Sequence, residues 1–392
     1  MHSVLQNTSR KKFFLFSAQA LAQGINLCYI CQRGHLNFMK KRITIKEIAE
    51  IAGVNISTVS RVLNPDSGGR IGREQREKII AICDKLNYRP RVTAKGCAQN
   101  KTFKIGLILG AIERDLCNSS FALYIRGVCS ILQKHGYNLA ILWVGETQYT
   151  QAEEVKNFLM SDTADGYILG ASMLEEQSLE VFRNSGRPIL SFNNNWEGFF
   201  PGFMSVETDQ NPAASRIWKA MPQELYSQVL FFGPEGDNTL FKAAAIEKYI
   251  PSGIFLEKLL FPLEHPRQSE FYAYWLARNN IAANWEKVIR KKVIWCTSDM
   301  SAFGVCDELQ SKGLQVGKDI FVIGYGNTEK KCPCPGKEPY LSTIEPLWEE
   351  AGYASANLIL DAIKNPSDDL PHKKIESSYI CRKSFPFDVQ IE

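Results

Sequence analysis

Hydrophobic and polar residues follow helical spacing from residue 43 onward. The apolar positions of the first segment are Ile45, Ile48, Ala49 and Ala52, which would form one stripe on a helix. Thr44 and Glu47 have the spacing of a capping box, in which each side chain bonds a free backbone N–H at a helix start. Gly53 follows as a turn residue. The pattern therefore predicts a short helix that ends in a tight turn.

Two further helices are predicted after this turn. Asn55 is placed to cap the second helix, and its buried side chains would be Val54, Val59, Val62 and Leu63. A third helix is expected from about Arg73 to Asn87, because Pro90 disfavours helical backbone at the residue before it. Its inward positions would be Ile79, Ile82 or Cys83, and Leu86. Two short helices joined by a glycine-containing turn predict a helix-turn-helix.

From Lys104 the pattern changes to short apolar runs separated by helical segments. The runs are Ile105–Leu109, Asn138–Trp143, Tyr167–Leu169, Pro188–Phe192, Val229–Phe232, Val293–Trp295 and Ile320–Ile323. Helical segments include Phe121–His135, Phe241–Tyr249 and Ser301–Lys312. This alternation predicts an α/β fold with parallel sheets flanked by helices. Two such units in tandem would form two lobes with a cleft at the carboxyl ends of the strands, where open α/β sheets bind ligands.

Composition and charge narrow the class of protein. The 392 residues are 45% hydrophobic and 22% charged, as in ordinary soluble globular proteins, and no apolar run approaches the roughly 18 residues of a membrane span. Residues 39–101 carry 14 Lys/Arg and 6 Asp/Glu, whereas residues 102–392 carry 28 Lys/Arg and 36 Asp/Glu. A basic module joined to an acidic body is typical of proteins that bind nucleic acid with one end. Chance clustering is the alternative that charge alone leaves open.

The 11 cysteines do not form the pattern of a disulfide framework. Their number is odd and most lie in apolar patterns, which indicates a reducing, cytoplasmic location. The close pairs Cys28/Cys31 and Cys332/Cys334 lack further ligands at metal-binding spacing, so no metal site is predicted. We interpret residues 1–38, which hold a basic patch and a short apolar run, as a disordered or mis-assigned leader. Translation would then begin at Met39.

The second helix of a helix-turn-helix enters the major groove of DNA and presents its early residues to base edges. Here these residues are Asn55, Ile56, Ser57 and, one turn later, Arg61. Arginine can bond a guanine through two hydrogen bonds, and an apolar side chain can contact a thymine methyl group. Candidates for phosphate contacts, which position a protein without reading sequence, are Thr58 and Ser60. The alternative is an accidental helical pair.

Three segments resemble the signature of the LacI family of transcriptional regulators: IKEIAEIAGV at 45–54, STVSRVLN at 57–64 and LNYRP at 86–90. The resemblance covers about residues 43–385. It implies a helix-turn-helix DNA-binding domain at 39–91, a hinge at 92–102, and a dimeric body at 103–392 shaped like a periplasmic sugar-binding protein. It also assigns DNA contacts to Thr44, Asn64, Ala94 and Cys97.

The predicted hinge departs from the family pattern. In the family this segment becomes helical on operator DNA and inserts a leucine into the minor groove, which kinks the duplex. The matching position here is Cys97, and the neighbouring Gly96 weakens a helix by up to about 1 kcal/mol relative to alanine. A weaker or altered kink is therefore expected.

The resemblance also places the residues that would contact a small effector between the lobes. They are Lys242, Ser298, Asp299, Asn327 and Trp348, with Asn193 as a further candidate near the lobe crossing. Lys242 stands where the family has an arginine that clamps sugar hydroxyls, and lysine lacks the guanidinium fork. Alternatives remain open: Lys242 also fits a solvated helix residue, Asp299 a cap of a helix beginning at Met300, and Trp348 a core residue.

The body contains no G-x-G-x-x-G, P-loop or G-x-S-x-G motif. Its histidines, such as His372 beside a proline in an expected loop, assemble no base and nucleophile, so neither an enzyme nor a cofactor is predicted.

We predict a transcriptional regulator that represses a sugar-utilisation operon as a homodimer on double-stranded operator DNA. A sugar or glycoside would control it, and the nearest relatives would be repressors of β-galactoside utilisation. The alternatives are a sensor of the same fold with weakened DNA binding, a non-sugar effector, and a periplasmic sugar-binding protein.

Overall fold

The computed structural model describes residues 43–63, 71–86, 88, 101–109, 119–144, 148–161, 163–170, 174–193, 202–262, 270–331 and 338–389. The chain divides into two compact units, Met1–Lys95 and Gly96–Glu392. Among the described helices none is both long and apolar enough to span a membrane. The predicted leader at 1–38, the hinge positions Ala94, Gly96 and Cys97, and Asn64 lie outside the described residues.

The first unit is a three-helix module. Its helices are α3 (Ile45–Ala52), α4 (Ile56–Leu63) and α5 (Arg73–Lys85). The predicted capping box is confirmed, because the Thr44 hydroxyl accepts from the Glu47 N–H and Glu47 accepts from the Thr44 N–H. Gly53 ends α3 with φ +70°, a left-handed conformation that favours glycine. The third helix is shorter than predicted and ends at Lys85.

The three helices share one small core. Its fully buried members are Ile48, Ala49, Ala52, Val59, Val62, Ile79 and Cys83. The predicted inward positions are thus confirmed for all three helices, although Val54 and Leu63 are only half-buried. Lys78 donates from Nζ to the Ala52 carbonyl at 3.1 Å and joins α5 to the end of α3. The helices of residues 43–86 therefore share one continuous core, and this core supports α4 from the side opposite its exposed face.

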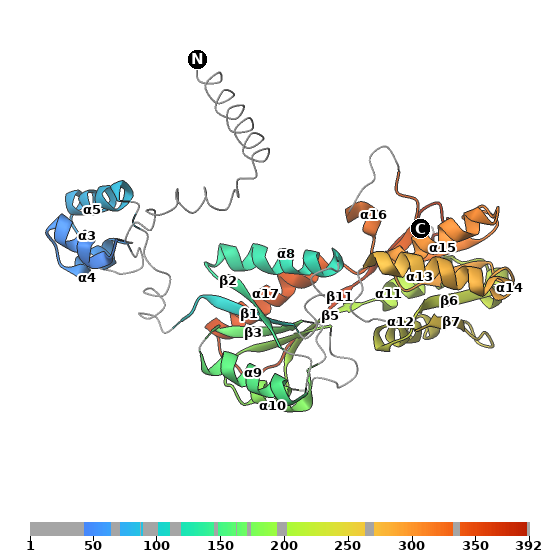
Figure 1. Ribbon diagram of the computed structural model, residues 1–392, viewed down its shortest axis with the longest axis horizontal. Coiled ribbons are helices and arrows are strands. Elements are labelled where there is room, and N and C mark those ends of the chain that lie inside the picture. Colours follow the sequence, from blue (N-terminus) through green and yellow to red (C-terminus); the bar gives the residue numbers. More distant parts are fainter. Residues whose placement is uncertain are drawn as a thin grey trace, which may run out of the picture. The chain divides into compact units, whose positions relative to one another are not determined.

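The second unit contains two lobes, each built on a six-stranded sheet (Figure 1). The N-terminal lobe has the strand order β11-β5-β4-β3-β1-β2. Its strands are β1 (Lys104–Leu109), β2 (Asn138–Trp143), β3 (Gly166–Gly170), β4 (Ile189–Phe192), β5 (Met204–Asp209) and β11 (His372–Glu376). Its helices are α8 (Ser119–Lys134), α9 (Gln148–Met160), α10 (Glu176–Arg183) and α17 (Trp348–Lys364).

Helices cover both faces of this sheet, as predicted. Side chains of α8 and α17 pack with one set of strand residues, and side chains of α9 and α10 pack with the other set. A Cβ on Gly127 of α8 would collide with the Glu349 carbonyl of α17, so only glycine allows these helices to approach so closely. The core on this face therefore depends on a helix from the far end of the chain.

The C-terminal lobe has the strand order β12-β10-β9-β8-β6-β7. Its strands are β6 (Val229–Pro234), β7 (Glu257–Phe261), β8 (Val293–Cys296), β9 (Phe321–Tyr325), β10 (Ser342–Glu345) and β12 (Ser378–Ile380). Its helices are α11 (Asn211–Ala220), a 3₁₀ helix (Gln223–Gln228), α12 (Asp237–Glu247), α13 (Glu270–Ala283), α14 (Trp285–Val288), α15 (Asp299–Ser311) and α16 (Thr328–Lys331). Helices α13 and α15 pack on one face and α11 and α12 on the other.

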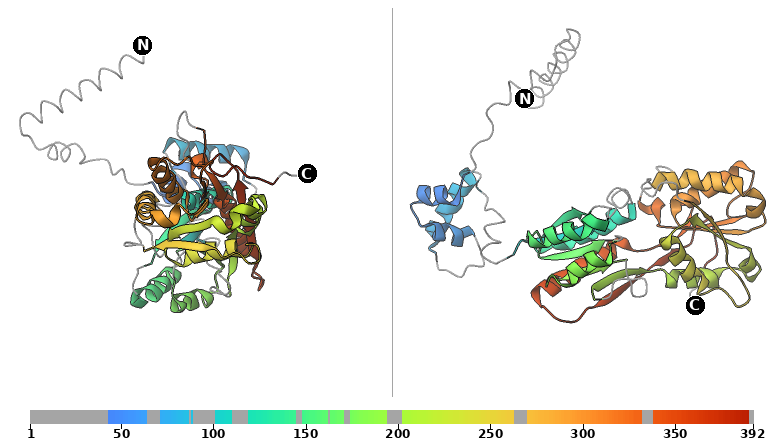
Figure 2. Two further views of the ribbon diagram at one scale, coloured as in Figure 1. Left: turned by 90° about the vertical axis from the view of Figure 1, so that its right-hand side faces the viewer. Right: turned by 60° about the horizontal axis from the view of Figure 1, so that its bottom comes forward.

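The chain passes between the lobes three times. It crosses from β5 to α11, returns from β10 to α17, and crosses again from β11 to β12. Figure 2 shows the red C-terminal part of the chain running between the two lobes. All seven predicted strands are present, and the predicted parallel sheets are confirmed, with β12 as an antiparallel edge strand beside β10. One expectation is wrong, because His372 begins β11 instead of lying in a loop.

Candidate functional site

The exposed face of α4 carries most of the residues predicted to contact DNA. Ile56 is 44% exposed although it is apolar, and Ser57, Ser60 and Arg61 are exposed beside it. Val59 and Val62 of the same helix are buried and Leu63 is half-buried, so α4 has one core face and one exposed face. The exposed part of α4 therefore presents an apolar side chain and an arginine, two kinds of side chain that can read base edges.

Three of the predicted contact residues also have structural roles. The Asn55 side-chain oxygen accepts from the Ser57 N–H at 2.9 Å and caps α4. The Thr44 hydroxyl is engaged in the capping box of α3, and Thr58 is half-buried. For Asn55 the amide NH₂ group remains the part suited to a phosphate or base contact. The caps fix the start of each helix, and with it the direction in which the exposed face of α4 points.

The predicted effector residues of the C-terminal lobe meet at the carboxyl ends of β8 and β9. Asp299 is buried, and its two oxygens accept from the Thr343 hydroxyl and the Thr328 N–H, both at 2.6 Å. Burial raises the pKa of this carboxyl, against the hydrogen bonds from Thr343 and Thr328 that lower it. Ser298, not Asp299, is the N-cap of α15, because its hydroxyl accepts from the Ser301 N–H at 3.1 Å.

Lys242 of α12 points into this group of residues. Its Nζ donates to the Thr297 carbonyl at 2.8 Å and lies 3.8 Å from the centre of the Tyr325 ring. Burial lowers the pKa of Lys242 to about 7, while the nearby carboxylate of Asp299 opposes this shift. The alternative of a solvated helix residue is therefore not what the structure shows. The ammonium group is held by a carbonyl and an aromatic face.

Asn327 lies on the same side of this lobe. It is buried with φ +53°, and its side-chain oxygen accepts from Arg382 Nη2 at 2.6 Å. Its Nδ2 group has no hydrogen-bond partner within the described residues. A buried donor without a partner costs about 1–3 kcal/mol. This amide is thus suited to a ligand oxygen.

The other two candidates belong to the N-terminal lobe. Trp348 begins α17, and its ring packs edge-on against Phe192 and Phe121 at centroid distances of 5.2 and 6.3 Å. Its indole Nε1 is buried and has no partner in the part of the chain that the structure describes. Asn193 has φ +52°, and its side-chain oxygen accepts from the Thr208 N–H at 2.8 Å. Trp348 is therefore partly a core residue, but with an unused donor.

Several residues of this network were not predicted from the sequence. Thr208, at the end of β5, bonds Asn193. Its side chain also lowers the pKa of Tyr325, which burial raises, so Thr208 lies near candidates of both lobes. Arg382 holds Asn327 and forms an ion pair with Glu329 at 3.6 Å. Sequence spacing gave no signal for these contacts, since Arg382 is 55 residues from Asn327.

The described residues contain no group of three or more His, Cys, Asp or Glu side chains that could hold a metal ion. The Cys28/Cys31 and Cys332/Cys334 pairs lie outside them.

Two family models match the chain. Residues 44–91 match the bacterial regulatory proteins of the lacI family, and residues 231–385 match a periplasmic binding protein-like domain. The first match covers helices α3 to α5, and the second covers most of the C-terminal lobe together with α17 and β11.

Similar curated proteins match over most of their length. Catabolite control protein A of Staphylococcus xylosus is 27% identical over 339 residues, which cover 84% of this chain and 97% of that protein. The transcriptional repressor PurR of Vibrio vulnificus is 25% identical over 340 residues, covering 83% and 93%.

Solved structures share the fold. A lac repressor dimer bound to operator and the anti-inducer ONPF aligns with a TM-score of 0.69 at 20% identity, over 88% of this chain and 100% of that one. The complex of the transcriptional regulator CelR with cellobiose aligns with a TM-score of 0.59 at 16% identity over the same shares.

Proposed function

Since this chain belongs to the lacI family of bacterial regulatory proteins, we propose that it represses transcription of a sugar-utilisation operon. Residues 39–91 would bind operator DNA, residues 92–102 would form the hinge, and residues 103–392 would bind the effector and dimerise. The protein would act in the cytoplasm as a homodimer and not as an enzyme. The observation that carries the proposal is the exposed face of α4, with Ile56 and Arg61 held on a capped core.

DNA recognition would divide the residues of this unit into two groups. Arg61 and Ile56 would contact base edges, with Arg61 contributing about 1–3 kcal/mol of base discrimination. Thr58 and Ser60 would contact phosphates, which adds affinity without sequence preference. Asn55 and Ser57, at the start of α4, would also face base edges. Thr44 would bond a phosphate near the start of α3, where backbone N–H groups attract anions. The predicted contacts of Asn64, Ala94 and Cys97 remain part of the proposal.

The effector would bind between the lobes at the carboxyl ends of the strands. The unused donors of Asn327 and Trp348 would bond hydroxyl oxygens of a sugar or glycoside, and the Trp348 ring would cover its apolar face. Lys242, Ser298, Asp299 and Asn193 would line the same site. Because Lys242 already bonds Thr297 and Tyr325, it would present a single ammonium donor instead of the fork of an arginine.

Control of DNA binding requires that the effector bind one arrangement of the lobes better than the other. Thr208 bonds Asn193 of the N-terminal lobe, and its side chain lowers the pKa of Tyr325 of the C-terminal lobe against the effect of burial. An effector that contacts the residues on either side of Thr208 would therefore favour one angle between the lobes. The coupling free energy would be the difference between its affinities for the two states.

A DNA selection with the purified full chain tests the proposal, repeated with a panel of sugars and glycosides. Enrichment of a palindrome that one sugar releases is the expected result. Enrichment that no sugar affects would support a DNA-binding regulator and favour a non-sugar effector. No enrichment would favour the sensor with weakened DNA binding, which Gly96 and Cys97 in the hinge make the second candidate.

A further inference from the structure

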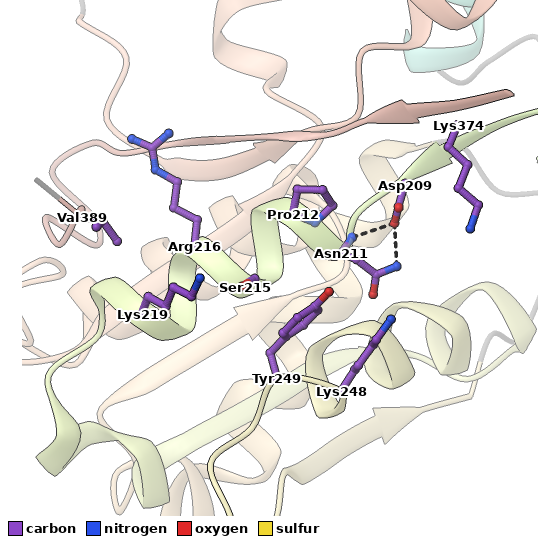
Figure 3. Close-up of a pocket in the computed structure, with 10 residues that line it drawn as sticks. All are labelled: Asp209, Asn211, Pro212, Ser215, Arg216, Lys219, Lys248, Tyr249, Lys374 and Val389. Atoms are coloured by element: carbon purple, nitrogen blue, oxygen red, sulfur yellow. Dashed lines mark hydrogen bonds between the residues drawn. The ribbon is translucent and has the colours of Figure 1, made fainter. Parts of the chain in front are cut away.

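A hollow of about 600 Å³ lies on the body where the chain passes from one lobe to the other (Figure 3). Its walls come from the end of β5, from α11, from the residues after α12, from β11 and from the C-terminal segment. The volume falls within the roughly 300–1,000 Å³ of small-molecule sites. None of its lining residues belongs to the network around Lys242 and Asp299.

Three lysines from three different elements line this hollow: Lys219 of α11, Lys248 just after α12 and Lys374 of β11. Within the described residues none of them forms an ion pair, whereas many other exposed cations of the body do, such as Arg126 with Glu349 and Lys330 with Glu345. The lysines therefore gather positive charge around one concave surface, with Lys374 in register with Glu207 of β5 and Lys248 Nζ 5.7 Å from the centre of the Tyr249 ring.

The other charged groups of the hollow do not cancel this excess. Arg216 is neutralised by Asp388, to which it donates two hydrogen bonds of 2.8 Å. Asp209 is the one carboxylate among the lining residues, and its Oδ1 accepts from both the backbone and the side-chain nitrogen of Asn211, at 2.9 and 2.6 Å. The remaining balance is three ammonium groups against one carboxylate.

This charge is unusual for its surroundings, because residues 102–392 carry 28 Lys/Arg against 36 Asp/Glu. Gathering like charges on one concave surface costs free energy unless an anion occupies it. Lysine ammonium groups bind phosphate as point charges. Three of them around one hollow match an anion with two or more charges.

The neutral lining residues indicate what the rest of the ligand carries. Ser215 and Tyr249 offer hydroxyl groups and Asn211 an amide, and Figure 3 shows Tyr249 and Lys248 extending toward Asn211. Such groups bond hydroxyls, and the Tyr249 ring offers an apolar face. We propose that this hollow is a second ligand site, specific for a small phosphorylated metabolite.

The test is isothermal titration calorimetry of the full chain with pyrophosphate at low ionic strength. A variant with Lys219→Ala, Lys248→Ala and Lys374→Ala removes the three ammonium groups. The matched control, with Lys134→Ala, Lys364→Ala and Lys373→Ala, removes the same charge from three exposed lysines outside the hollow. Because all six side chains are exposed, both variants should fold, and circular dichroism checks this.

The unmodified chain and the control should bind pyrophosphate alike, and the hollow variant should bind at least tenfold more weakly. Equal binding by the hollow variant and the control, or no binding by the unmodified chain, would overturn the proposal. Equal affinity for citrate would overturn the assignment to phosphate. DNA is absent from this assay, so its outcome is independent of whether the protein is a repressor.

Discussion

Replacing Lys242 with methionine should stabilise the folded chain at neutral pH. Lys242 is half-buried, its ammonium group contacts the Thr297 carbonyl and the Tyr325 ring, and burial lowers the pKa of Lys242 to about 7. Folding therefore disfavours the charged form that the unfolded chain carries at pH 7. Methionine keeps the apolar stem and removes the charge.

The size of the effect follows from three contributions. A pKa lowered from 10.5 to about 7 costs about 4 kcal/mol of stability at pH 7, at about 1.36 kcal/mol per pH unit. Against this, the hydrogen bond to Thr297 contributes about 1 kcal/mol and the cation–π contact with Tyr325 about 1 kcal/mol, and methionine loses both. The net gain of Lys242→Met at pH 7 is therefore about 2 kcal/mol.

The pH dependence gives the sharper test. Because folding lowers the pKa of Lys242, the unfolded chain binds more protons between about pH 7 and pH 10.5, and this lysine makes stability rise with pH in that range. The advantage of Lys242→Met should thus shrink toward zero by about pH 10.

Urea unfolding at several pH values measures this difference. Lys134→Met, at an exposed position, serves as the control and should differ little from the unmodified chain at any pH. If Lys242→Met and the unmodified chain showed parallel stability curves, or the variant were less stable at pH 7, the burial argument would be wrong.

Other substitutions test separate features. Arg61→Ala should relax base preference at one operator position by about 1–3 kcal/mol, and an unchanged preference in a DNA selection would remove its assigned role. Thr44→Ala should lower the stability of the helical unit by about 1 kcal/mol, because the capping box is lost; thermal unfolding measures this. Gly127→Ala should destabilise the N-terminal lobe by several kcal/mol, since the new Cβ meets the Glu349 carbonyl, and denaturant unfolding that matches the unmodified chain would contradict this. Asp299→Asn replaces one of two hydrogen-bonded oxygens with an NH₂ group and should cost about 1–3 kcal/mol in the same assay.

Local chemistry made part of this structure predictable from the sequence. The capping box of Thr44 and Glu47 and the turn at Gly53 depend on residues within four positions of each other. Several strands predicted from apolar runs are buried on both faces, as in β3 and β4, where every residue is buried. Such elements leave a continuous hydrophobic signal.

The missed elements had no such signal. β11 is an edge strand with four of five residues exposed, so its sequence HKKIE contains no apolar run. The partners of the candidate effector residues were missed for a different reason. Thr208 and Arg382 reach their partners through the strand crossings, and residue spacing along one chain does not reveal such contacts. Motif spacing placed Lys242 correctly on α12, but not its contact with Tyr325.

The three crossings between the lobes determine the order in which the parts of this protein can fold during synthesis. The helical unit is complete once residue 88 has been made, because its core and the side chains packed against it, up to Tyr88, lie within one contiguous segment. The N-terminal lobe, by contrast, needs α17 and β11, so it must wait for residues 348–376. On one face its first five strands would be covered by α8 alone while the whole C-terminal lobe is translated. Ribosome-bound chains stopped before residue 348 should therefore contain a folded helical unit but an incomplete body that depends on chaperones.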